Sequence, residues 1–290
     1  MTQPAVRLVR ADNPGPMTLE GTNTWLVGRR RVLVVDPGPA DDAHLRAVLD
    51  AVGPALAGVL LTHRHPDHSE ALGAPLLRAA LARAGAPVLA ADPSLGDPVT
   101  PEAVAAVCDE PAEPLALAGH TDDSVGLVVA GERVVLTGDT VLGRGTSVVA
   151  HPDGDLGAHL ASLRRLRALL DGGGVGGGGE GDHDGTRDDG GARPWRGLPG
   201  HGPEVPDLAR RVEELLRHRA ERVRQVREAL ALLDPGRDRV GARAPADDDG
   251  LVAAVVAHVY PDLTDPVLLG AAGRTVRATL VHLARSDATG

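Results

Sequence analysis

Four side chains that can bind metal ions lie close together in the segment Thr62-His63-Arg64-His65-Pro66-Asp67-His68. Neutral imidazole and carboxylate groups are suitable ligands for zinc. In an extended loop, alternate positions send His63 and His65 to one side, while Asp67 and His68 turn to another. The apolar run at residues 58–61 precedes the segment, as expected of a buried strand that ends where the ligands begin. The segment therefore predicts a site that can serve two metal ions.

Three further candidate ligands follow predicted strands, each beside a glycine that lets the backbone turn closely around an ion: His120, Asp139 and His201. A lone histidine is more often a surface or core residue than a ligand. Together with the first segment, however, the three complete a ligand set. The other histidines lack such a setting and are interpreted as structural, among them His44, His151, His159, His258 and His282.

Two zinc ions that share a water molecule lower its pKa and present hydroxide as a nucleophile. Asp67 is placed to hold this hydroxide or accept its proton, and then to help protonate the leaving group. Asp36, at the end of a predicted strand, either orients a ligand histidine or forms a turn before Pro37. Cys108 is expected to be a small buried residue.

Composition limits the function further. The 290 residues have a formal net charge of -10, which argues against general binding to duplex DNA and against non-specific coating of nucleic acids. Aromatic residues make up 1% of the chain, which excludes a base-stacking platform, and one cysteine excludes a cysteine-rich zinc module. No apolar run is long enough to cross a membrane. We expect a cytoplasmic protein with no membrane partner.

The elements that must position these residues alternate between short apolar strands and helices, which indicates an α/β fold. We expect strands at residues 5–9, 23–27, 31–35, 57–61, 88–90, 125–130 and 133–137, and helices at 41–52, 69–84 and 155–170. Gly131 and Glu132 predict a two-residue hairpin turn between the last two strands. Residues 171–191, rich in Gly and Asp and including His183, predict a flexible insertion.

The second half of the chain is predicted to be helical. A long helix is expected from about residue 207 to 233, followed by a polar stretch and a helix-turn-helix arrangement at residues 250–285. Residues 209–244 hold 10 arginines against 6 acidic residues, so one net-basic stretch stands in an acidic chain. We expect a catalytic domain at residues 1–206 and a linker helix with a small helical domain at residues 207–290.

With these motifs in this order over roughly the first 205 residues, the chain resembles a metallo-β-lactamase-fold hydrolase. The resemblance implies an αββα sandwich with the metals at one edge between two sheets. It further implies that His63, His65 and His120 bind one zinc ion and that Asp67, His68 and His201 bind a second. Asp139 would bridge the two ions.

Within this superfamily the chain is similar to the β-lactamase-like protein 2 group, through residues 13–24, 119–123, 138–146 and 199–203. This likeness implies a winged-helix-like C-terminal domain, entered through a helix whose His218, Arg219 and Arg222 would bind the substrate. The chain departs from the family pattern at Glu70 and Ala71, where two glycines are usual, and at Arg64 and Pro66 in the metal loop.

Three functions remain open. The first expectation is hydrolysis of phosphodiester bonds in single-stranded RNA by a metal-bound hydroxide, which the likeness to endoribonuclease-like proteins implies. The same hydroxide could attack an acyl carbon, so a glyoxalase II-like thioester, lactone or β-lactam hydrolase is the alternative, and its substrate would be a small ester-type molecule. A winged-helix-mediated binding or regulatory protein is the non-enzyme alternative, which the complete ligand set disfavours.

Overall fold

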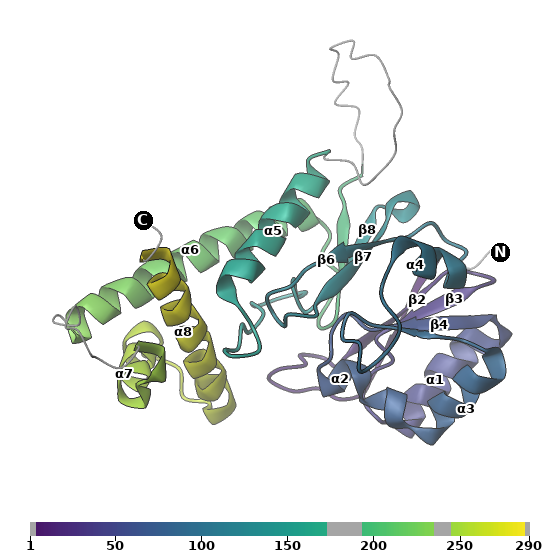
Figure 1. The fold of residues 1–290 in the computed structure, drawn as a ribbon, viewed down its shortest axis with the longest axis horizontal. Coiled ribbons are helices and arrows are strands. Elements are labelled where there is room, and N and C mark those ends of the chain that lie inside the picture. Colours follow the sequence, from purple (N-terminus) through teal and green to yellow (C-terminus); the bar gives the residue numbers. More distant parts are fainter. Residues whose placement is uncertain (1–3, 173–192, 235–244, 288–290) are drawn as a thin grey trace, which may run out of the picture.

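The computed structural model describes residues 4–172, 193–234 and 245–287. Most of the predicted flexible insertion, with His183, therefore lies outside the described residues. The fold is built on two sheets that face each other (Figure 1). None of the helices formed by the described residues has the length and apolar character that a membrane span requires.

The first sheet has the strand order β1-β2-β3-β4-β5. Its strands are β1 (Val6–Arg10), β2 (Asn23–Val27), β3 (Val32–Val35), β4 (Leu56–Leu60) and β5 (Val88–Leu89). The first three pair antiparallel, whereas β3, β4 and β5 are parallel. Parallel strands need crossover connections, and these are supplied by α1 (Asp42–Val52) and α3 (Pro75–Ala84).

The second sheet has the order β6-β7-β8-β9. Its strands are β6 (Glu113–Ala116), β7 (Val125–Val129), β8 (Val134–Gly138) and β9 (Arg196–Pro199). Strands β6, β7 and β8 pair antiparallel, and β9 adds in parallel to β8. The short helix α4 (Pro101–Val107) precedes β6. The strand ranges expected from the sequence include neither β6 nor β9.

Alternation of side chains along the strands creates three apolar layers. In β3, Leu33 and Val35 face the second sheet, whereas Val32 and Val34 face α1 and α3. On the far side, Val128 and Val135 pack against the helix α5 (Leu156–Leu170) and against the first half of α6 (Leu208–Leu233). Because both faces are covered at the centre of each sheet, the central strands β3, β4 and β7 are almost uniformly apolar. The expected αββα sandwich is confirmed.

Two local predictions were wrong. Instead of one helix over residues 69–84, the chain forms α2 (Pro66–Ser69), a 3-10 turn at Glu70–Gly73 and then α3. Pro75 has no N–H to continue a helix, so a new helix begins there. The connection between β7 and β8 is also longer than two residues: the last strand pair is Val129 with Val134, and a 3-10 turn at Ala130–Glu132 lies between them.

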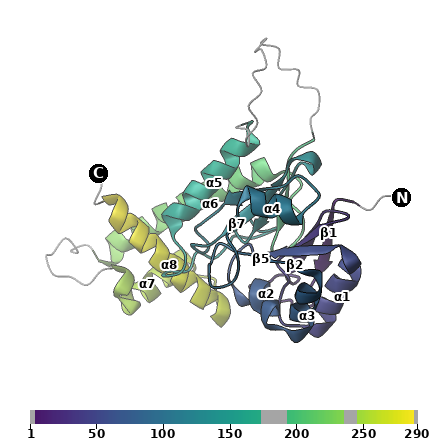
Figure 2. The ribbon, with the colours of Figure 1, turned by 45° about the vertical axis from the view of Figure 1, so that its right-hand side comes forward.

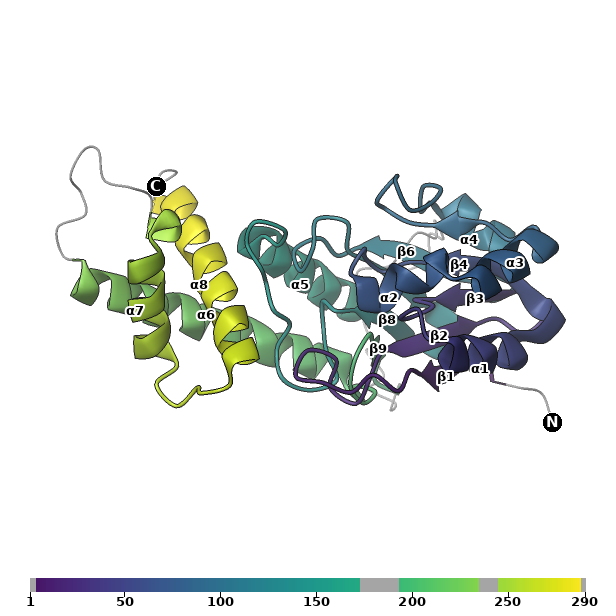
Figure 3. The same cartoon turned by 90° about the horizontal axis from the view of Figure 1, so that it is seen from below.

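The C-terminal unit consists of helices in the part of it that the structure describes. The second half of α6 packs against α7 (Asp249–Val259) and α8 (Pro266–Asp287), through Val226, Val255 and Val276. Seen from below, α6 runs from the sandwich to these two helices (Figure 3). A turned view shows α8 crossing near α5 and α6 (Figure 2). No strand occurs in residues 208–234 or 245–287, so the winged-helix assignment is not confirmed.

Candidate metal centre

The predicted ligands come from four loops that meet at one edge of the sandwich. His63 and His65 follow β4, and Asp67 and His68 lie on α2. His120 lies in the β6–β7 connection, Asp139 directly follows β8, and His201 is the second residue after β9. Hydrogen bonds join the two sheets here, since Val125 N–H donates to Thr62 O and Asn23 N–H donates to Gly200 O, each at 2.8 Å.

Three imidazoles form the first group. The Nδ1 atom of His65 lies 3.1 Å from Nε2 of His63 and 3.0 Å from Nε2 of His120. All three ligand atoms lie within 4.8 Å of one another. The structure therefore brings together the three residues that the resemblance assigns to one ion.

Asp67, His68 and His201 form the second group. The Nε2 atoms of His68 and His201 are 3.1 Å apart, and Oδ2 of Asp67 lies 3.0 Å from Nε2 of His201. Asp139 stands between the groups: its Oδ2 atom is 3.8 Å from Nε2 of His120 and 3.4 Å from Nε2 of His201. Its carboxylate therefore reaches both groups, as a bridging ligand must.

In two of the histidines, the nitrogen that faces away from the centre is held through one buried carboxylate. Asp36 accepts a hydrogen bond from Nδ1 of His68 at 2.8 Å. It also accepts one from the Thr62 hydroxyl at 2.7 Å, and that hydroxyl lies 3.0 Å from Nδ1 of His63. The expectation that Asp36 orients a ligand histidine agrees with this geometry. Its positive φ of 55° also places Asp36 in a turn, so both alternatives describe the residue.

The remaining histidines have similar partners. Nδ1 of His120 lies 2.7 Å from the Val148 carbonyl and 3.0 Å from the Ser147 hydroxyl. Nε2 of His65 is 3.3 Å from Asp153, and Nδ1 of His201 is 3.3 Å from the carbonyl of Gly21. A fixed acceptor on one ring nitrogen sets the tautomer and leaves the other nitrogen free for a metal.

Burial and charge divide the histidines into two kinds. Desolvation lowers the pKa of His63 and His120 and lowers that of His65 to about 4, so these rings are neutral at pH 7. Desolvation also acts on His201, but Asp139 and Asp67 outweigh it and raise its pKa to about 10. Asp36 and Asp139 likewise raise the pKa of His68. The carboxylates thus favour positive charge at this end of the centre.

The charges of the carboxylates follow the same pattern. Desolvation opposes ionisation of Asp139, yet His201 and His68 lower its pKa well below the ordinary value. Desolvation also opposes ionisation of Asp67, but the hydrogen bond to His201 and the charges of His68 and His201 together outweigh it and lower the pKa of this carboxyl. Both side chains are therefore ionised at neutral pH. Two buried or half-buried carboxylates facing the same point favour a cation there.

The donor set fits divalent metal ions on geometric grounds. In a tetrahedral site with Zn–N bonds of about 2.0–2.1 Å, two ligand atoms are roughly 3.3 Å apart. The separations of 3.0 to 3.8 Å described above lie around this value. Oδ1 of Asp139 is buried with no hydrogen-bond partner, which is costly unless a cation lies beside it. A Cβ atom on Gly200 would lie 2.4 Å from this oxygen, so only glycine leaves space for it.

Acidic side chains and one arginine lie next to His65. Arg64 forms ion pairs with Asp122, Asp123 and Asp153. With one cation against three anions, this rim, defined here as Arg64, Asp122, Asp123 and Asp153, has a net charge of -2. Asp153, Ser147 and Val148 were not expected from the sequence, because they lie in a loop with no periodic pattern.

The three predicted substrate-binding residues lie on α6 and differ in their surroundings. Arg219 is buried, and its Nη2 donates to the carbonyl of Ser147. Arg222 donates to the carbonyl of Val259 at 3.1 Å and lies over the ring of Tyr260. His218 is half-buried. The two arginines therefore have protein partners, and the substrate-binding role of the three residues stays a prediction.

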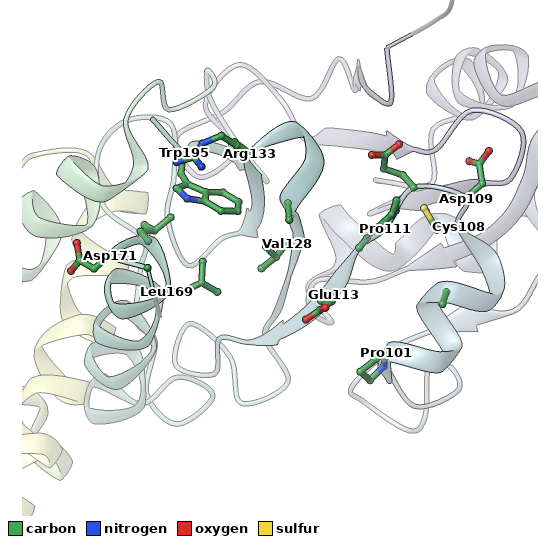
Figure 4. A pocket seen from close by; sticks show the side chains of 16 residues that line it. Pro101, Cys108, Asp109, Pro111, Glu113, Val128, Arg133, Leu169, Asp171 and Trp195 are labelled. Carbon is green, nitrogen blue, oxygen red and sulfur yellow. The ribbon is translucent and has the colours of Figure 1, made fainter. Parts of the chain in front are cut away.

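A cavity of about 890 Å³ lies elsewhere, and none of the predicted ligands lines it. Cys108, Val128, Leu169 and Trp195 are among the residues that line it (Figure 4). Cys108 is buried beside it, with its Sγ 3.4 Å from the carbonyl of Val27, as expected of a small core residue. The side chains that can bind a metal ion therefore lie at the histidine cluster and not in this cavity.

Comparisons with known proteins agree with this geometry. The chain is 30% identical over 275 residues to the lactamase-like protein adaB of Aspergillus niger, covering 93% of this chain and 74% of that protein. It is 30% identical over 232 residues to an atrochrysone carboxyl ACP thioesterase of Claviceps purpurea (78% and 66%). It is 28% identical over 237 residues to a beta-lactamase-like protein 2 homolog of Caenorhabditis elegans (78% and 71%).

Solved structures share the fold. A beta-lactamase domain protein from Burkholderia ambifaria has a TM-score of 0.64 at 19% identity, covering 98% of this chain and 87% of that one. A metallo-beta-lactamase family protein from Thermus thermophilus has a TM-score of 0.60 at 21% identity (98% and 95%). The family profile described as the Metallo-beta-lactamase superfamily matches residues 17–173. The chain therefore belongs to the metallo-beta-lactamase superfamily and is a metal-dependent hydrolase.

Proposed function

We propose that the chain is a dinuclear zinc hydrolase. In this proposal, one ion is held by His63, His65 and His120 and the other by Asp67, His68 and His201, with Asp139 between them. The observation that carries the proposal is the orientation of five imidazoles, each with one nitrogen at a protein acceptor and the other facing a common centre. Nitrogen and carboxylate ligands at these separations suit zinc.

When bound, two such ions supply Lewis-acid catalysis and acidify a water molecule enough for it to act as a nucleophile at neutral pH. The protein contributes Asp67, whose side chain is 29% exposed and therefore open to substrate. Because Asp67 is ionised, it can accept a proton from the attacking water and pass it to the leaving group. His201, 3.0 Å away, holds this carboxylate in place.

We propose that the substrate is a small acyl compound, in particular a thioester. The net charge of -2 on the rim beside His65 disfavours a polyanion and leaves an uncharged acyl group unaffected. The similarity to a relative named as an acyl carrier protein thioesterase supports the same substrate class.

Hydrolysis of single-stranded RNA is the second candidate. It is favoured by the net-basic stretch at residues 209–244, which lies in the chain soon after His201. Phosphate binding needs free cations. Within that stretch, Arg210, Arg211 and Arg224 form ion pairs with Glu214, Glu221 or Glu228, in addition to the protein contacts of Arg219 and Arg222. We therefore rank hydrolysis of RNA second, after hydrolysis of an acyl substrate.

The domain division at residues 206 and 207 and a cytoplasmic location stay predictions. We propose the division because the metal centre lies entirely before residue 207. The contact of α6 with both the sandwich and α7–α8 makes this helix the linker between the two parts.

The test is a substrate panel with purified protein of quantified zinc content. A glutathione thioester, an aryl ester, a β-lactam and fluorogenic single-stranded RNA would be compared for wild type and Asp139→Ala. We expect thioester turnover that is lost on chelation, restored by zinc and reduced at least 100-fold in the variant. A higher kcat/KM for RNA than for every acyl substrate would reverse the order of the two candidates. Absence of bound metal and of turnover would contradict both.

A further inference from the structure

Arg219 is an unusual side chain in this fold because it is a buried cation without an acidic partner among the described residues. Its exposed fraction is 4%, and Nη2 donates to the carbonyl of Ser147. Nε is buried and has no hydrogen-bond partner. Burial lowers its pKa to about 10, so the guanidinium stays charged at neutral pH. Burying an unpaired charge is costly, and a side chain that is 4% exposed offers little surface to a substrate.

The loop that Arg219 contacts also supplies the acceptors for a predicted metal ligand. The Ser147 hydroxyl lies 3.0 Å from Nδ1 of His120, and the Val148 carbonyl lies 2.7 Å from the same atom. A carbonyl can only accept, so Nδ1 of His120 carries the proton and Nε2 is left free to bind a metal. The carbonyl of Ser147 belongs to the peptide plane that joins the two residues. Fixing this plane fixes the two Cα atoms from which the Ser147 hydroxyl and the Val148 carbonyl extend toward His120.

Helix α6 holds this loop at a second point. Arg211, two turns before Arg219, donates through Nη2 to the carbonyl of Gly145. Val149 of the loop is fully buried, and it packs in one cluster with Leu216 of α6 and Ala278 of α8. Carbonyls two residues apart are thus bound by arginines that are eight residues apart on α6. The loop is therefore braced against α6 and α8.

We propose that Arg219 is a positioning residue that acts on His120 through the loop at residues 147 and 148, and not by contacting substrate. Through the Ser147 carbonyl it keeps the Ser147 and Val148 acceptors on Nδ1 of His120. Nε2 then faces the centre in a single tautomer. The expected effect on metal binding rests on the proposed metal site, because a misaligned Nε2 of His120 would bind the ion more weakly. The effect on the tautomer does not require metal.

The first experiment therefore uses the full chain without metal. Long-range proton–nitrogen spectra of protein labelled with ¹⁵N-histidine report which ring nitrogen carries the proton. Wild type should show His120 as a single Nδ1–H tautomer. Arg219→Met, which removes the donor and keeps an apolar stem, should show tautomer exchange at His120. Arg219→Lys, which keeps a donor near Ser147, should restore the wild-type signal.

Arg210→Met is the matched control, because Arg210 lies on the same helix, is exposed and pairs with Glu214. Its His120 signals should equal those of wild type. Thermal unfolding of each variant separates loss of the fold from loss of orientation. If Arg219→Met and Arg219→Lys give the same His120 spectrum while both are folded, the proposal is overturned. If Arg219→Met does not fold, Arg219→Lys is compared with Arg210→Met instead. The proposal predicts a single Nδ1–H tautomer of His120 in both variants, and mixed tautomers in Arg219→Lys overturn the proposal.

The second experiment titrates the same proteins with Co²⁺ and follows its visible absorption, which reports coordination geometry. Arg219→Met should bind the ion in the His120 group about 10-fold more weakly, with a changed spectrum, while Arg210→Met behaves as wild type. Equal affinity and equal spectra for wild type and Arg219→Met would contradict this inference alone. Failure of wild type to bind Co²⁺ would contradict the proposed metal site instead.

Discussion

The carboxylate of Asp36 lies 2.8 Å from Nδ1 of His68 and is almost completely buried. The same carboxylate accepts the backbone N–H of Thr62 at 2.7 Å, which fixes the start of the loop that carries His63. Asp36 therefore connects a residue of each histidine group to one rigid point at the end of β3. A buried anion in this position serves the orientation of ligands as well as the stability of the turn.

Replacing Asp36 with asparagine should weaken metal binding by about 10- to 100-fold. The amide keeps the size of the side chain, and asparagine tolerates the positive φ, so the backbone is preserved. It cannot accept from His68 and Thr62 as two carboxylate oxygens do. Competition with a chromophoric zinc chelator measures the affinity. The exposed Asp50→Asn is the control, and equal affinities for the two variants would remove the orienting role.

Gly200→Ala should also lower metal affinity, through space and not through hydrogen bonding. The added Cβ would lie 2.4 Å from Oδ1 of Asp139 and 2.7 Å from Cε1 of His68, so at least one of these side chains must move. We expect a loss of about 10-fold or more in affinity for the Asp139 end of the centre. Gly73→Ala is a matched control, because a Cβ at Gly73 meets nothing within 4 Å. Unchanged zinc stoichiometry and affinity in Gly200→Ala would contradict this prediction.

Much of the sandwich could be predicted because its strands carry their own signal. Strand β2 was expected at residues 23–27 and is found there, since its apolar residues are bounded by polar turns. By contrast, β9 contains Gly197 and Pro199 and becomes a strand by pairing with β8, a contact between distant parts of the chain. Strand β6 begins with Glu113 and Pro114, which single-strand propensity disfavours. Both strands form because they pair with a neighbouring strand in the folded protein, and no local sequence pattern reports this pairing.

The site could be predicted more fully than its surroundings. Ligands need particular side-chain types, so His63, His65 and Asp67 are recognisable from type and spacing. Acceptors for the distal ring nitrogens need only an oxygen in the right place. At His120 these are a backbone carbonyl and a serine hydroxyl, which any loop could supply. These acceptors can be identified only from the three-dimensional structure.

Asp67→Asn should reduce turnover while zinc is retained, because asparagine cannot accept a proton from the attacking water. We expect a loss of kcat/KM on the order of 10²- to 10⁴-fold for an alkyl ester. The loss should be smaller for a thioester, because a thiolate leaving group, with a conjugate-acid pKa near about 8.5, needs no proton to depart. Steady-state rates with zinc measured in each sample test this, with the exposed Asp97→Asn as control. Equal losses for the two substrates would remove the proton transfer to the leaving group, and unchanged rates would remove the role of Asp67 altogether.

Asp109 should make the stability of the sandwich depend on pH in the acidic range. Its carboxylate accepts hydrogen bonds from the backbone N–H groups of Arg29 and Arg30 at 2.8 and 3.0 Å. Asp109 thus ties the β2–β3 turn to the segment that follows α4. Desolvation opposes ionisation, but these hydrogen bonds outweigh it and lower the pKa from 3.8 to about 2. Because the unfolded chain takes up the proton first, the stabilisation is complete above about pH 5 and is lost as the pH falls toward 2.

Asp109→Asn should therefore be less stable than wild type at pH 6, and the difference should shrink steadily as the pH is lowered below about 5. Urea unfolding of chelator-treated protein between pH 3 and 6 measures the difference, so that the metal centre contributes equally to both proteins. The exposed Asp12→Asn, which has no side-chain hydrogen bond among the described residues, should follow wild type across the range. A difference between Asp109→Asn and wild type that stays constant with pH would show that the carboxylate's charge is not what holds the turn.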